Sequence, residues 1–94
     1  MTRLDLSGNN LDGVIPSKLG NLSELTWLSL SRNRLSGKIP PELGNLSMLT
    51  ELNLGNNQID GEIPSELGKL TSLQILHLSD NRLSGFIPAT FGNR

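Results

Sequence analysis

The side chains best suited to contact another molecule recur at two positions of this chain, directly before and after the first leucine of a repeated Leu-x-Leu segment. The first position holds Arg3, Trp27, Glu51 and Ile75, and the second holds Asp5, Ser29, Asn53 and His77. Side chains alternate between the two faces of a strand, so leucines on the inner face leave these residues on the outer one. Charges, an indole, an imidazole and amides on one surface suit non-covalent recognition of a peptide or protein. We therefore predict these eight residues as the ligand-binding set.

Trp27 is the most informative member of this set, because it is the only tryptophan in the chain. Placed between Arg3 and Glu51, it has the character of an interface hot spot. It could equally be an isolated exposed aromatic, which is common on protein surfaces. His77 has two interpretations as well, a pH-sensitive contact or a solvated polar residue.

Catalytic chemistry finds no support in the residue pattern. Ser29 and Ser31 lack a histidine on a neighbouring strand, since the only histidine, His77, lies two strands away. One histidine without cysteines is too little for a metal site, and no phosphate-binding glycine loop occurs. We predict no enzyme activity and no cofactor. The loop residues Arg32, Arg34, Arg82 and Asp80 form either a site for an acidic partner or a solvated rim.

These residues are positioned by a strict 24-residue period. The phrase Leu-x-Leu-x-x-Asn-x-Leu-x-Gly-x-Ile-Pro-x-x-Leu-Gly occurs in segments 1–24, 25–48, 49–72 and, incompletely, 73–94. One such unit is too small to bury its own apolar side chains, so successive units must stack. We predict a single α/β domain over residues 1–94, with equivalent strands side by side in a parallel sheet about 4.8 Å apart.

Three further columns of the repeat have structural explanations. Asn9, Asn33, Asn57 and Asn81 are predicted to point inward as a ladder that satisfies buried loop amides and carbonyls. The glycine columns that contain Gly13 and Gly20 predict positive φ or close approach between turns. The proline column that contains Pro16 is predicted at the first position of a short helix or 3₁₀ turn.

Composition excludes several classes of partner. The net charge is −1, with acids and bases mixed along the chain, so we expect no binding to nucleic acid and no membrane contact by this segment. The N-terminus reads as a repeat strand and not as a signal peptide. No cysteine is present, which excludes disulfides. The Asn-Leu-Ser sequences at Asn21 and Asn45 are glycosylation sequons or simply the wording of the repeat.

The segment from Leu28 to Pro40 resembles the leucine-rich repeat of the plant-specific subfamily, and Ser84-Gly85-Phe86-Ile87-Pro88 has the same signature. The resemblance implies a right-handed solenoid with a parallel sheet on its concave face, extended segments at Gly-x-Ile-Pro and 3₁₀ or helical turns on the convex side. Such repeats form the ectodomains of receptor-like kinases and receptor-like proteins, and polygalacturonase inhibitors. They usually bind a peptide, protein or small hormone, which implies an extracellular or cell-surface parent protein.

The chain lacks the paired cysteines of the family's usual caps, and both end coils are predicted to expose core residues. At one end these are Met1, Leu4, Leu6, Leu11 and Ile15, and at the other Leu76, Leu78, Leu83, Ile87 and Phe91. The chain is therefore expected to be a fragment, a designed or excised piece, or a unit that self-associates through its uncapped ends. Three functions stay open at this point: a recognition module, structural spacer repeats without a ligand, and an inhibitor of a cell-wall-degrading enzyme.

Overall fold

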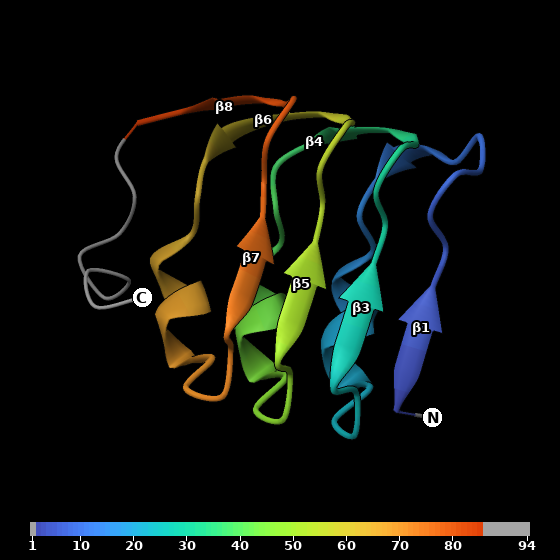
Figure 1. Cartoon of the computed structure of the whole chain (residues 1–94). Helices are drawn as coiled ribbons and strands as arrows, with labels where there is room; N and C mark the ends of the chain where they lie inside the picture. The colour runs from blue at the N-terminus through green and yellow to red at the C-terminus, as the bar shows by residue number, and fades with distance from the viewer. Residues whose placement is uncertain (1, 86–94) are drawn as a thin grey trace.

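The computed structural model describes residues 2–85 and shows a chain that coils repeatedly through the same three kinds of element (Figure 1). The first parallel sheet has the order β1-β3-β5-β7, with strands Arg3–Asp5, Trp27–Ser29, Glu51–Asn53 and Ile75–His77. The second line of strands has the order β2-β4-β6-β8, with strands Asp12–Val14, Arg34–Gly37, Gln58–Glu62 and Arg82–Ser84. Within residues 2–85, a 3₁₀ helix follows each of β2, β4 and β6: η1 (Ser17–Asn21), η2 (Pro41–Asn45) and η3 (Ser65–Lys69).

The first sheet confirms the predicted pairing of equivalent strands. Leu28 is in register with Leu4 and with Leu52, so neighbours along the sheet are one 24-residue repeat apart. The second sheet is paired differently, because Gly13 lies opposite Leu35, 22 residues further on. The coils are therefore offset by two residues between the two sheets.

The second sheet was not expected as a hydrogen-bonded structure. The predicted extended segments were placed at Gly-x-Ile-Pro, whereas the strands lie mainly before them, around the preceding leucine. Alternation explains this placement: Leu35 is buried between the exposed Arg34 and the half-buried Ser36, which is the period-two pattern of a strand. Once the coils stack, these segments lie one coil apart and complete each other's backbone hydrogen bonds.

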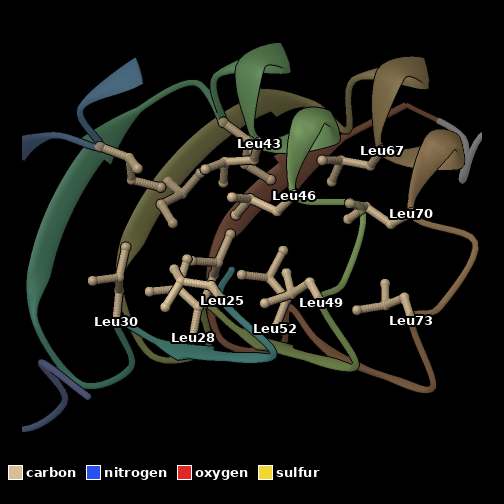
Figure 2. Packing of buried hydrophobic residues seen from close by; sticks show 14 of the residues in the cluster. Leu25, Leu28, Leu30, Leu43, Leu46, Leu49, Leu52, Leu67, Leu70 and Leu73 are labelled. Atoms are coloured by element: carbon tan, nitrogen blue, oxygen red, sulfur yellow. The ribbon is translucent and has the colours of Figure 1, made fainter. Parts of the chain in front are cut away.

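The leucines fill the space between the sheets and the 3₁₀ helices, and Figure 2 shows their side chains meeting there. Leu28, Leu52 and Leu43 are fully buried, and each such side chain stabilises the fold by about 2 kcal/mol. Their equivalents in the first coil, Leu4 and Leu19, are only partly buried. No helix within residues 2–85 is both long and apolar enough to cross a membrane.

The expectation for the end coils is met in part. Leu6, Leu76, Leu78 and Leu83 are partly buried, and Leu11 is 39% exposed. Ile15 was also predicted to be exposed, and this was wrong: it is 3% exposed and belongs to the core, because its side chain packs among the leucines of the adjacent coil. Met1, Ile87 and Phe91 lie outside the described residues.

The asparagine ladder is confirmed for Asn33, Asn57 and Asn81, whereas Asn9 was also predicted to point inward but is exposed and donates only to the Leu6 and Ser7 carbonyls of its own coil. Asn33 donates through Nδ2 to the carbonyls of Leu6, Leu30 and Ser31 at 3.0–3.1 Å, and its Oδ1 accepts from the Leu11 N–H at 3.1 Å. Asn57 and Asn81 repeat this arrangement one and two coils later. Each amide thus bonds to its own coil and to the preceding one, which joins the coils at the point where the chain leaves the first sheet.

The two glycine columns serve the two predicted purposes separately. The column that contains Gly37 has positive φ, +74° at that residue. In the second column, a Cβ on Gly44 would lie 2.3 Å from the Glu66 carbonyl oxygen, so only glycine allows η2 and η3 to approach this closely.

The proline prediction was wrong by one position. Pro40 precedes η2 as its N-cap, with φ −69° and ψ 133°, and Pro16 and Pro64 stand in the same way before η1 and η3. The proline carbonyl starts the turn by accepting from the N–H three residues on, 3.2 Å away at Leu43. The proline ring therefore fixes the extended approach to the helix and not its first turn.

Candidate functional site

The predicted ligand-binding residues lie in two rows across the first sheet, whose four strands are seen side by side in Figure 1. Because side chains alternate along a strand, these rows lie on the face opposite the leucines. Strand register places Arg3, Trp27, Glu51 and Ile75 in one row, and Asp5, Ser29, Asn53 and His77 in the other. Arg3, Asp5, Ile75 and His77 are exposed; Trp27, Glu51 and Asn53 are half-buried. The structure thus brings the two rows together, but it does not make all eight residues equally accessible.

Ser29 differs from the other members of the set. Only 2% of it is exposed, although it lies on the outer face, because a short side chain here stands in register with the longer Asp5 and Asn53 on the adjacent strands. Its hydroxyl lies 3.2 Å from the hydroxyl of Ser31, which is also buried. Ser29 therefore offers a ligand almost no surface.

Trp27 has an ordered neighbour on one side. The Arg3 guanidinium carbon lies 3.9 Å from the centroid of the indole ring, within cation–π distance. Because Arg3 is on β1 and Glu51 is on β5, the two charged residues flank Trp27 from opposite strands. Arg3 thus covers one side of the indole, and Trp27 as a whole is half-buried.

Residues of the second row also stabilise the turn that follows each strand, a role that sequence reasoning missed. Asp5 accepts from the Ser7 N–H at 3.0 Å and from the Ser7 hydroxyl at 2.6 Å. Asn53 accepts from the Gly55 N–H at 3.0 Å. The signal was present as Asp, Ser and Asn at equivalent positions, the residue types that bond a backbone N–H two residues on.

The same bonds change the electrostatics of Asp5. The hydrogen bond from the Ser7 hydroxyl, followed by that from the Ser7 N–H, lowers the pKa of the Asp5 carboxyl. Desolvation opposes these two bonds, and the positive charges of Arg3 and Arg32 lower this pKa further by smaller amounts. Asp5 is therefore a carboxylate whose charge is already compensated within its own coil and the next.

Arg32 was grouped at the sequence level with the other loop arginines, and the structure separates them. Its guanidinium lies over Gly8 of the preceding coil, with Nη2 3.1 Å from the position a Cβ on that glycine would take. Arg34 and Arg82 instead belong to strands β4 and β8, in register with Asp12 and Asp60. The predicted loop cluster is thus not one surface.

A column of left-handed residues also escaped the sequence analysis. Gly8, Arg32, Asn56 and Asp80 have φ between +55° and +68°. Glycine, asparagine and aspartate are the types that tolerate this conformation, and their recurrence at one position of the repeat was the available signal.

A shallow groove lies elsewhere, at the junction of β4, β6 and η2. Lys38, Ile39, Pro40, Pro41, Gly61, Glu62 and Pro64 line it. The aliphatic stem of Lys38 crosses over Gly61, with Cγ 3.0 Å from the position of an added Cβ. None of the predicted ligand-binding residues lines this groove.

The comparison with known families agrees with the repeated coil, the inward leucines and the asparagine ladder. A family model described as leucine-rich repeat matches residues 1–59, and one described as two copies of leucine-rich repeats matches residues 47–88. The chain belongs to the leucine-rich repeat family. Among curated proteins, none matches this leucine-rich repeat chain.

Solved structures place the chain with plant receptor ectodomains. The structure of PEPR1 with AtPEP1 is 54% identical, with a TM-score of 0.95, over 97% of this chain and 13% of that one. The BIR3–SERK2 complex from Arabidopsis thaliana is 42% identical, with a TM-score of 0.94, over 99% and 50%. The plant peptide hormone receptor RGFR1 in complex with RGF2 is 48% identical, with a TM-score of 0.95, over 97% and 15%.

These leucine-rich repeats are therefore of the plant type, and their likeness to peptide-hormone receptors supports a ligand-binding module. The chain spans half or less of the length of each of these three structures.

Proposed function

We propose that this chain is a non-catalytic recognition module that holds a peptide or protein on the exposed face of the first sheet, as part of a larger receptor-like protein at the cell surface. We further propose that residues 1–94 act as one domain of four repeats. The observation that carries the proposal is Trp27, half-exposed in the middle of that face and held there by Arg3 at 3.9 Å. Residues that dominate binding at interfaces are enriched in tryptophan and lie near the centre of the contact surface.

Two further observations support a binding role. One of the similar structures is the plant peptide hormone receptor RGFR1 in complex with RGF2, and another is PEPR1 with AtPEP1. Catalysis by Ser29 is disfavoured because its hydroxyl is buried and faces Ser31 and not a base. The principal alternative is a spacer function, in which the coils only connect other repeats and Trp27 has no partner.

The experiment is a selection of random 12-residue peptides displayed on phage, with the purified chain as target. We expect enriched peptides to change the fluorescence of Trp27, which reports on this site alone because it is the only tryptophan. Trp27→Ala should weaken these peptides by about tenfold or more, as expected for a hot spot.

Met48→Ala is the matched control, since Met48 is a large hydrophobic residue, 51% exposed, that lies outside both sheets. It should leave the affinity unchanged. Circular dichroism of both variants checks that the fold is retained. Peptides that bind equally well to the Trp27→Ala variant, or a selection that enriches none, would support the spacer function instead.

A further inference from the structure

The inference concerns the chemistry of the ligand and rests on the proposed function. We propose that Glu51, between Trp27 and Ile75, binds an arginine or lysine side chain of the ligand, next to an apolar ligand residue that packs on Ile75. The recognition face thus selects peptides in which a cationic residue and an aliphatic residue lie close together.

Charge is unevenly distributed over the outer face of the first sheet. Strand β1 carries Arg3 and Asp5, which have opposite signs and lie on the same face. Asp5 is further compensated by Ser7 and Arg32. On β5 and β7 the outward residues are Glu51, Asn53, Ile75 and His77, so Glu51 is the one permanent charge of this half of the sheet. A ligand that covers this half must neutralise a carboxylate.

Glu51 lies between two apolar side chains of the same face. It is half-buried and in register with the indole on one side and with Ile75, 44% exposed, on the other. Within residues 2–85 its carboxylate forms no hydrogen bond and no ion pair. Covering such a group without supplying a partner is costly, since a desolvated charge requires pairing. A ligand cation is therefore needed for binding over Glu51.

The surface around Glu51 fits a long side chain with an apolar stem and a cationic end. Arginine and lysine lay their methylene stems along apolar surface and keep the charged end on a polar group. Ile75 and the Glu51 side of the indole provide such surface around the carboxylate. The other flank of the indole already holds Arg3 at 3.9 Å, so the ligand cation approaches Trp27 from the β5 side.

The test uses two blocked 12-residue peptides with identical glycine, serine and leucine content, one with three arginines and the other with three glutamates. Binding is followed by the fluorescence of Trp27 and by the NMR signal of its indole N–H. We expect the arginine peptide to bind more tightly than the glutamate peptide, with an affinity that falls as salt is raised. Glu51→Gln should weaken the arginine peptide about two- to fivefold and reduce its advantage.

Glu66→Gln is the matched control, because Glu66 is an exposed carboxylate on η3, away from the first sheet. It should leave both affinities unchanged. Equal affinities of the two peptides, an unchanged affinity in the Glu51→Gln variant, or no signal change with the arginine peptide at millimolar concentration would each overturn the inference. The proposed function is decided separately, since peptides from the random selection that depend on Trp27 but not on Glu51 would retain it.

Discussion

Replacing Asn57 by alanine should lower the free energy of unfolding by about 2 kcal/mol. Asn57 is 9% exposed, and all of its side-chain polar atoms are bonded. Its Oδ1 accepts from the Leu35 N–H at 3.0 Å. Its Nδ2 donates to the carbonyls of Leu30, Leu54 and Gly55 at 3.0, 3.2 and 3.2 Å. The substitution removes all four bonds, but their loss does not have equal consequences.

The three carbonyls each keep a second donor: Asn33 Nδ2 on Leu30 O (3.0 Å), Asn81 Nδ2 on Leu54 O (2.8 Å) and the Arg32 N–H on Gly55 O (3.0 Å). The Leu35 N–H donates to Oδ1 of Asn57 in the unsubstituted chain. In the variant this N–H loses its acceptor at a buried residue. One orphaned buried donor costs about 1–3 kcal/mol. The weakened carbonyl bonds add to this cost, while the removal of a buried amide offsets part of it.

Urea denaturation, followed by far-ultraviolet circular dichroism and by the fluorescence of Trp27, measures this effect. Asn9→Ala is the internal control, because Asn9 is exposed and donates only to the Leu6 and Ser7 carbonyls, with no earlier coil in front of it among the described residues. The control should lose less than about 0.5 kcal/mol. Equal losses in the two variants, or an unchanged midpoint for Asn57→Ala, would refute the reasoning.

Two further predictions address the packing of the coils and the electrostatics of the first sheet. Gly44→Ala should destabilise the chain by about 1–3 kcal/mol, because its Cβ would lie 2.3 Å from the Glu66 carbonyl oxygen. A Cβ on Gly13 would meet open space, and only the φ of +81° at this residue is unfavourable for alanine. Gly13→Ala should therefore lower the free energy of unfolding less than Gly44→Ala in the same denaturation experiment, and a larger loss would contradict the close-approach argument. Ser7→Ala should raise the pKa of Asp5 toward its ordinary value, because the Ser7 hydroxyl is the largest cause that lowers it. A lowered pKa in the folded state stabilises the fold above the ordinary pKa, and this contribution is lost as pH falls through the folded value. The free energy of unfolding of the Ser7→Ala variant should therefore fall less on acidification. An NMR titration that gives the Asp5 carboxyl the same pKa with and without the substitution would contradict this.

The 24-residue period was sufficient to predict stacking, the parallel pairing of equivalent strands and the inward position of residues such as Leu28. Recurrence at one column records an environment shared by all coils, so it also predicted the asparagine ladder and the two purposes of the glycine columns, but not which column serves which purpose. It failed at Ile15, because the period cannot tell how far an end residue is covered by its neighbours. It also predicted Pro40 as the first residue of the 3₁₀ helix, whereas Pro40 is the N-cap that precedes it, since proline suits either position at a helix start.

The candidate site shows the same division between what the repeat pattern predicts and what packing decides. Alternation around each leucine predicted the two rows of outward residues, because the side-chain period of a strand is fixed by its backbone. The accessibility of each member was decided by its neighbours: Ser29 is buried because longer side chains stand on the adjacent strands. The stacking of Arg3 on Trp27 depends on rotamers of two side chains 24 residues apart, which no periodicity specifies.

The sequence by itself determined which residues face inward, which face outward and that equivalent segments lie side by side. Only the tertiary structure decided the two-residue offset of the second sheet, the turn bonds of Asp5 and Asn53 and the place of Arg32 over Gly8. The physical reason is that a repeat fixes the average position of each column, whereas contacts between coils depend on their relative tilt and on side-chain rotamers. These are set only when all coils pack together.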